Sequence, residues 1–217
     1  WTDTELAAVY PERTAILHVG SISSWTAPGS DAIARLVEGL GGRALISVDP
    51  NIRPMLAEGP VGTALGNSRD VVRSRLDRLV ARADVVKVSA EDLDWLGDAG
   101  DLDATARDWA TRGPAVVLLT DGGSPLRVAR PGRPLLHRPI PPVTVVDTVG
   151  AGDSLAAGFL TGLLGSGVTT RAALEALSDE HLTELVDDAA LIAALNCTRV
   201  GADPPTRAEL AAARPPR

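Results

Sequence analysis

The chain has 217 residues, of which 45% are hydrophobic and 23% are charged, with 21 glycines, 16 prolines and one cysteine. This composition excludes a disordered or collagen-like chain, and the length predicts one globular domain over residues 1–217. The formal net charge is −7 and the arginines are scattered singly, so we expect no nucleic-acid partner. One cysteine, and no apolar run of about 20 residues, favour a cytoplasmic protein without membrane contact.

Short apolar runs alternate with segments of helical periodicity, as is typical of a parallel sheet covered by helices. The predicted strands, rich in β-branched and aliphatic residues, are 15–19, 44–48, 84–88 and 115–119. Apolar positions at helical spacing predict helices over 31–40 and 68–80. The predicted caps are Ser30 or Asp31 and Gly41-Gly42 for the first helix, and Ser68 for the second.

The chain changes character after the fourth strand. Residues 126–130 and 133–137 flank Pro131-Gly132 and predict a hairpin that adds an antiparallel edge, where Pro134 is tolerated. The remainder is helical, with predicted helices over 151–164, 170–177 and 182–197. The sequence therefore predicts an α/β fold with a mainly parallel sheet, followed by a helical end.

The segment Asp147-Thr148-Val149-Gly150-Ala151-Gly152-Asp153 lies between a β-like run, 143–146, and a predicted helix. Glycines allow close approach of the backbone to a ligand, and a helix N-terminus favours an anion, so we expect a phosphate site. Asp153 falls in the first helical turn, where its carboxylate can accept a proton from an attacking hydroxyl. The alternative is that Asp153 only caps the helix and the glycines only make a turn.

This segment is similar to the C-terminal signature of the ribokinase, or PfkB, family of carbohydrate kinases. Further segments agree with that family in order and spacing, namely 18–21, 48–54, 87–93, 119–122 and 197–202. The second of these resembles the fructokinase and 2-keto-3-deoxygluconate kinase branch. The resemblance implies a ribokinase-like three-layer αβα sandwich. It also implies an ATP-dependent phosphotransferase that moves the γ-phosphoryl of Mg-ATP to a hydroxyl of a small sugar, such as fructose or ketodeoxygluconate.

By this resemblance Asp153 is the catalytic base, in contact with the sugar hydroxyl, and the backbone N–H groups of Gly150, Ala151 and Gly152 form the anion hole. Asp147 shapes the loop and, with the backbone at Val149, helps to bind a monovalent cation such as K⁺. The alternative for Asp147 is a structural carboxylate that accepts hydrogen bonds from nearby backbone N–H groups.

The nucleotide side of the predicted site rests on the same resemblance. Thr120, Gly122 and Gly123 match the loop over the ATP phosphates, although Pro125 stands where the family usually has glycine; an ordinary turn is the alternative. The family's Asn-x-x-Glu motif, which orients Mg²⁺, is represented by Ser89 and Asp92.

We therefore expect Ser89 to contact the nucleotide complex and Asp92 to act as a metal ligand, with Glu91 as a further candidate ligand. The alternative is a plain helix start capped by Ser89.

The remaining candidates are secondary. Asn51 and Arg53 follow a strand end and are predicted to face substrate; the alternative is a helix-entry turn with Arg53 in a surface salt bridge. Ala190 and Gly201 are candidates for adenine contact, although the small residues around Ala190 suit helix packing equally well. The three histidines have no metal-site spacing, so we assign no transition metal.

The resemblance also implies that the lid and first strands of the family fold are absent, because the chain starts after the lid region. An exposed sheet edge would then favour self-association, with a homodimer as the candidate assembly. Two alternatives remain open for function: a catalytically inactive nucleotide- or sugar-binding module, and a nucleoside kinase of the same fold.

Overall fold

The computed structural model describes residues 1–10 and 13–214, and the chain divides into two compact units. The first unit comprises Trp1–Asp121, Arg127–Leu136 and Thr169–Glu175, and the second comprises Gly122–Leu126, His137–Val168 and Ala176–Arg217. One domain over the whole chain stays a prediction, because compactness does not show whether the units fold independently. Within the described ranges, no helix combines the length and the apolar character that crossing a membrane requires.

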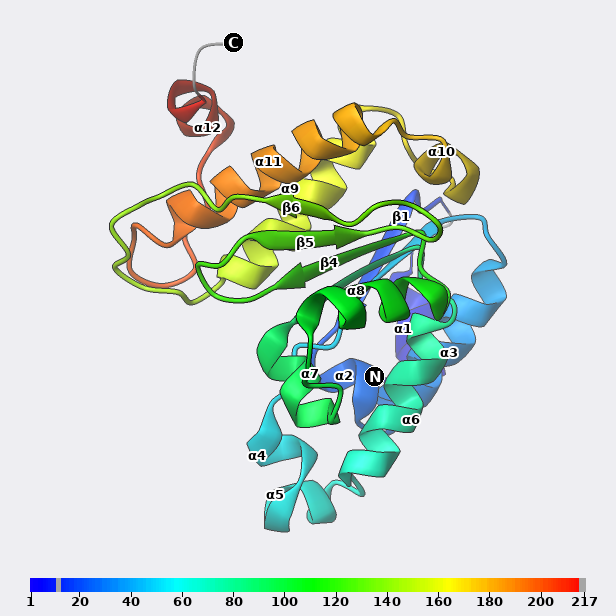
Figure 1. Cartoon of the computed structure of the whole chain (residues 1–217). Helices are drawn as coiled ribbons and strands as arrows, with labels where there is room; N and C mark the ends of the chain where they lie inside the picture. The colour runs from blue at the N-terminus through cyan, green and yellow to red at the C-terminus, as the bar shows by residue number, and fades with distance from the viewer. Residues whose placement is uncertain (11–12, 215–217) are drawn as a thin grey trace. The chain divides into compact units, whose positions relative to one another are not determined.

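The strands form one sheet in the order β1-β2-β3-β4-β5-β6 (Figure 1). Neighbours among the first four strands are parallel, and β5 pairs antiparallel with β4. The strands are β1 (Ile16–Gly20), β2 (Leu45–Asp49), β3 (Val85–Ser89), β4 (Val116–Thr120), β5 (Leu126–Ala129) and β6 (Leu136–Arg138). The α/β class, the mainly parallel sheet and its antiparallel edge are therefore confirmed, and β6 starts after Pro134 rather than across it.

Each parallel strand begins and ends one residue later than predicted. The reason is that backbone pairing continues past the last apolar residue, with Gly20 opposite Asp49 and Ser89 opposite Thr120. Hydrogen bonds of the ladder, not hydrophobicity, set the end of a strand. As a result, the carboxyl ends of β2, β3 and β4 carry polar side chains at the edge where ligands bind in open α/β sheets.

Three amphipathic helices connect the parallel strands: α3 (Gly29–Leu40), α6 (Arg69–Val80) and α8 (Leu102–Thr111). Their apolar faces share one core with alternate strand residues and with Trp25, which lies outside these elements. Members of this core from the helices and strands include Ile46, Val48, Leu76, Val86, Val88, Trp109, Val117 and Leu119. The caps predicted at Ser68 and Gly41 are confirmed, because Ser68 Oγ accepts the Val71 N–H and Gly41 has φ +52°. The cap predicted at Ser30 or Asp31 is wrong, since α3 already begins at Gly29.

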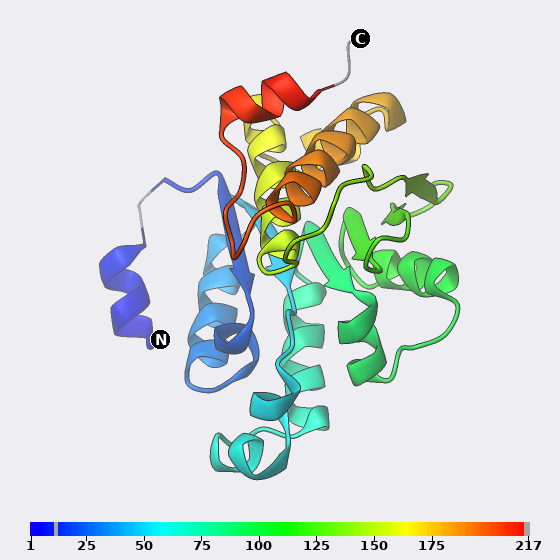
Figure 2. The same ribbon diagram turned by 90° about the vertical axis from the view of Figure 1, so that its left-hand side faces the viewer.

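The sequence patterns gave no prediction for several short helices of the first unit. They are α1 (Asp3–Val9), α2 (Ile22–Trp25), α4 (Pro54–Ala57) and α5 (Gly59–Ala64), whereas α7 (Ala90–Leu96) begins at the helix start that was the alternative for Ser89, and α10 (Arg171–Glu175) lies within the predicted 170–177. Such helices are too short to show a clear apolar period. Figure 2 shows α1 beside α3, where Asp3 and Arg35 form an ion pair at 2.8 Å.

The second unit is helical, with α9 (Ala151–Gly165) packed along α11 (Asp179–Asn196), and α12 (Arg207–Ala213) near the C-terminus (Figure 2). The packing is close, because a Cβ built on Gly158 would lie 3.1 Å from Ala189 Cα. The start of α11 lies three residues earlier than predicted because Ser178 Oγ accepts the His181 N–H.

The β-like run predicted at 143–146 is wrong. This segment forms no strand, and Val145 and Val146 are 58% and 57% exposed. The Val146 N–H donates to the carbonyl oxygen of Cys197, which takes the place of a strand partner.

Candidate active site

The loop before α9 carries the segment that the sequence singled out. Gly150 is the N-cap of α9 and has φ +77°, a left-handed conformation that glycine adopts without strain. The Ala151 N–H donates to Thr148 O at 3.1 Å, and the Ser154 N–H begins the helix by donating to Gly150 O at 2.8 Å. Of the three predicted anion donors, Ala151 is therefore engaged in a turn, while Gly150 and Gly152 stay predictions.

Asp147 holds this loop together. Its Oδ1 accepts the Val149 N–H at 3.0 Å, and its Oδ2 accepts the Gly201 N–H at 2.8 Å. These backbone hydrogen bonds lower the pKa of the Asp147 carboxyl below its usual value, because they favour the ionised form. The structural reading of Asp147 is therefore supported, and the loop before α9 is tied to the segment that follows α11.

Asn196 is a residue of this loop region that sequence reasoning did not place. Its side chain is fully buried, and its Nδ2 donates to Val149 O at 2.8 Å. Ala202 packs directly against Gly150, since a Cβ built on Gly150 would lie 2.7 Å from Ala202 Cβ. An amide directly after the apolar run 189–195 of α11 is the signal in the sequence for such a role.

Asp153 lies in the first turn of α9 and its side chain is exposed. Helix geometry leaves the N–H groups of a first turn without partners inside the helix, and they add to the positive end of the helix dipole. A solvent-accessible carboxylate beside such donors has the chemistry of a general base next to an anion-binding helix end.

In the first unit, the loop after β2 carries Asn51 and Arg53. Pro50 O accepts the indole N–H of Trp25 at 3.1 Å, and the Ile52 N–H donates to Asp92 Oδ1 at 2.7 Å. Asn51 adopts φ +41°, which is uncommon for a residue with a side chain.

Arg53 begins α4 as its N-cap and is exposed. The helix-entry turn of its alternative is therefore present, but Arg53 forms no ion pair with another described residue.

Ser89 and Asp92 form a capping box at the start of α7. Ser89 Oγ accepts the Asp92 N–H, and Asp92 Oδ2 accepts the Ser89 N–H and hydroxyl at 3.2 and 2.7 Å. The plain helix start capped by Ser89 is thus what the structure contains, while Glu91 is exposed beside it.

Asp92, Glu91 and Asp147 are the carboxylates predicted as metal ligands. Over 1–10 and 13–214, no group of three or more His, Cys, Asp or Glu side chains lies together as a metal site would require. Both oxygens of Asp92 and both of Asp147 already accept N–H or O–H groups of the chain. Direct ligation by Asp92, Glu91 or Asp147 stays a prediction.

The remaining predicted nucleotide residues differ in exposure. Thr120 ends β4 with its hydroxyl 3.5 Å from Val88 O, and Gly122 has φ +52° with open space around it. Gly201 is partly exposed, whereas Ala190 is fully buried in α11 and offers no surface to a ligand. The small side chain of Ala190 therefore serves helix packing here.

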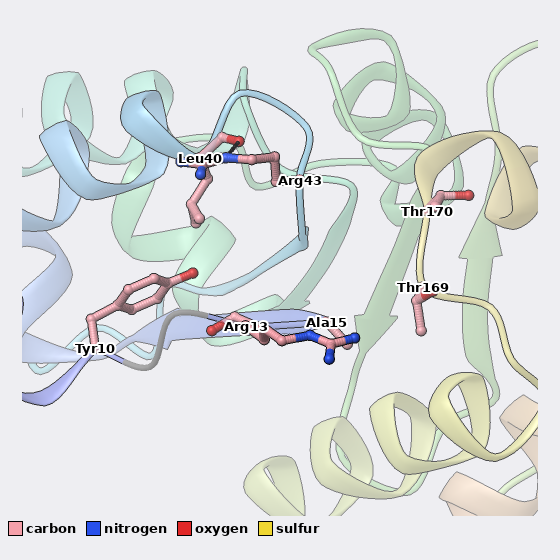
Figure 3. A pocket seen from close by; sticks show the side chains of 8 residues that line it. Tyr10, Arg13, Ala15, Leu40, Arg43, Thr169 and Thr170 are labelled. Atoms are coloured by element: carbon pink, nitrogen blue, oxygen red, sulfur yellow. Dashed lines mark hydrogen bonds between the residues drawn. The ribbon is translucent and has the colours of Figure 1, made fainter.

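A pocket of about 460 Å³ lies at the opposite edge of the sheet (Figure 3). It is lined by Tyr10, Arg13, Thr14, Ala15, Leu40, Arg43, Thr169 and Thr170. Ala15 precedes β1 and Arg43 precedes β2, so the pocket is at the amino ends of the parallel strands and contains none of the predicted site residues. Ligands of open α/β sheets bind at the carboxyl ends, so we do not assign this pocket to the reaction.

Comparison with known proteins agrees with this fold and motif. Residues 58–209 match the family model described as pfkB family carbohydrate kinase, and the chain belongs to this family. The predicted family and its ribokinase-like α/β fold are thereby confirmed. The relatives found are fructokinases: the chain is 36% identical over 167 residues to fructokinase from Rhizobium leguminosarum bv. trifolii. That match covers 76% of this chain and 48% of the relative.

Two solved structures are similar over most of the chain. Fructokinase from Xylella fastidiosa with bound ATP is 28% identical, with a TM-score of 0.71 over 87% of this chain and 56% of that one. A fructokinase double mutant from Vibrio cholerae O395, bound to fructose, ADP and potassium ion, is 25% identical, with a TM-score of 0.74 over 91% and 59%. The chain spans about half the length of the first curated relatives it matches.

Proposed function

We propose that this protein transfers the γ-phosphoryl group of ATP to a hydroxyl of a small sugar, with fructose as the first candidate. The observation that carries the proposal is the exposed Asp153 carboxylate in the first turn of α9, directly after the left-handed Gly150. Family membership and fructokinase relatives supply the reaction class, and both solved relatives described above have an adenine nucleotide bound.

In the proposed mechanism, Asp153 accepts the proton of the attacking sugar hydroxyl as the oxygen–phosphorus bond forms and the bond to ADP breaks. The N–H groups of the N-cap Gly150 and of Gly152 in the first turn, with the helix dipole, stabilise negative charge on the transferring phosphoryl group. Asp147 and Asn196 take no part in bond making; they hold the loop that presents these donors. Gly201 is retained as a candidate adenine contact.

Asn51 and Arg53 are proposed to bind the sugar, because they follow β2 at the carboxyl edge of the sheet and Arg53 carries an unpaired, exposed guanidinium in the described structure. Thr120, Gly122 and Gly123 are proposed to contact the ATP phosphates. Magnesium enters the assay as the counter-ion of ATP, and we derive no step through it. Replacing K⁺ by choline in the same assay tests the predicted monovalent cation.

The test is ADP release by the purified chain with Mg-ATP, with and without fructose, ribose, 2-keto-3-deoxygluconate or adenosine. We expect Asp153→Asn to lower kcat by about 10²–10⁴-fold, the usual contribution of a positioned general base. The matched control is Asp70→Asn, which alters an exposed first-turn aspartate of α6. Equal turnover by both variants would refute the role of Asp153.

A second candidate function is an inactive binding module of the same fold. It is favoured by Pro125 in the loop after β4, a position where the family usually has glycine. ATP binding without any sugar-dependent ADP release would favour this reading over the kinase. Stimulation by adenosine alone would instead indicate a nucleoside kinase.

A further inference from the structure

A charged pair lies inside the first unit, on strands that are otherwise apolar. Lys87 Nζ on β3 is 3.1 Å from Asp49 Oδ2 and 3.4 Å from Asp49 Oδ1 at the end of β2. The side chains of Lys87 and Asp49 are 8% and 3% exposed. Neither residue belongs to the site predicted from the sequence, although a lysine within the run Asp84-Val85-Val86-Lys87-Val88 is conspicuous.

Stability alone does not account for this pair. Removing two charges from water costs about as much as their attraction returns, so replacing both partners by uncharged residues of similar size is often neutral or stabilising. Removing one partner, in contrast, leaves an uncompensated buried charge. A pair that adds little net stability is better explained by what it holds in place.

Asp49 is the last residue of β2 and the first of the loop 49–53, which carries the proposed substrate residues Asn51 and Arg53. Asp49 O accepts the Ser21 N–H at 3.1 Å, and a Cβ built on Gly20 would lie 2.6 Å from the same oxygen. Two residues further on, Asn51 adopts φ +41°, and Ser21 has φ +55°. These are the only non-glycine residues with positive φ among those the structure describes. Asn51 follows Asp49 closely in the chain, and Ser21 is hydrogen-bonded to it.

Strained backbone of this kind persists where surrounding contacts over-determine it, and it is common at ligand-binding sites. The Trp25 indole and the Asp92 carboxylate fix the loop at Pro50 and Ile52. Lys87 fixes it at its first residue, through the side chain of Asp49.

We infer that Lys87 is a positioning residue: it holds Asp49, and through Asp49 it holds the loop that presents Asn51 and Arg53. Lys87 itself makes no contact with substrate in this account. The inference rests on the proposed function only in assigning this loop to substrate. That Lys87 holds the loop in place does not depend on the proposed function.

The test compares the wild-type chain with the double variant Lys87→Met/Asp49→Asn, which removes both charges. We expect the urea midpoint to stay near that of the wild type, while the amide protons of Ser21 and Ile52 exchange with solvent at least tenfold faster. The control amide is that of Ala115, which donates to Asp84 O at the other end of the strands and is expected to keep its exchange rate. Unchanged exchange at Ser21 and Ile52 would overturn the inference.

A double variant that does not fold would also overturn it, because the pair would then be required for stability. Where the wild-type chain phosphorylates a sugar, the double variant should raise KM for that sugar at least tenfold and change kcat less. Where the wild-type chain phosphorylates none, the proposed function fails, and the exchange rates still decide the role of Lys87.

Discussion

Replacing Gly150 by alanine tests whether the loop before α9 is held by backbone geometry. The new Cβ would lie 2.7 Å from Ala202 Cβ and 3.1 Å from Ala202 Cα, and φ is +77°. A left-handed conformation costs a residue with a side chain roughly 1–2 kcal/mol, and overpacking typically costs about 1–3 kcal/mol more. We therefore expect the free energy of unfolding to fall by about 2–5 kcal/mol, measured by urea denaturation.

The chain contains a matched control for the strain alone. Gly201 has φ +74°, close to that of Gly150, but a Cβ built on it meets no atom within 4 Å. Gly201→Ala should therefore cost about 1–2 kcal/mol, the strain without the clash. Adding Ala202→Gly to Gly150→Ala removes the closer of the two contacts and should recover part of the loss. Equal destabilisation by Gly150→Ala and Gly201→Ala would show that the loop moves freely and would refute this account.

Two further predictions concern Asp147 and a helix cap. The pKa of Asp147 is lowered in the folded chain, so its carboxylate stabilises the fold above the unfolded value of about 4 and loses that effect as the pH falls through the folded value. The difference in urea midpoint between the wild type and Asp147→Asn should thus be constant from pH 5 to 7 and shrink below pH 4; a constant difference down to pH 2.5 would contradict it. Ser68→Ala should cost about 1 kcal/mol in the same assay at pH 7, with Ser74→Ala within α6 as the control.

The sheet and the long helices α3, α6, α9 and α11 could be predicted because their signals are local, whereas α8 was not predicted. Each parallel strand is a run of about five apolar residues between helices of clear period, and Ser68, Gly41 and Gly132 are standard cap or turn residues. The secondary-structure prediction that failed concerns a segment whose conformation depends on contacts distant in sequence. The run 143–146 has strand composition but no neighbouring strand, and its Val146 N–H bonds to Cys197 instead.

The motif of the candidate site could be predicted from the sequence, whereas the distant residues that hold it in place could not. The spacing of Gly150 and Asp153 before a helix indicates an anion-binding turn with a carboxylate, and this much follows from the residues. Asn196 and Lys87 could not be placed, because nothing local indicates which backbone or carboxylate a distant polar side chain meets. The same limit applied to Ala190, where small size suited both adenine contact and helix packing, and its full burial favours packing.

Within the motif, loop geometry and the proposed chemistry fall on different residues. Asp147 is bound by two backbone N–H groups and Gly150 is confined by its φ and by Ala202, so both shape the loop. Asp153 has no such task, because its side chain is exposed on the first turn of α9. Substitutions at the shaping residues should therefore lower stability and turnover together, whereas substitution at Asp153 should lower turnover at nearly constant stability. A motif match of this kind includes residues that set the backbone conformation as well as residues proposed to take part in the reaction. Only the contacts of each residue distinguish these two roles.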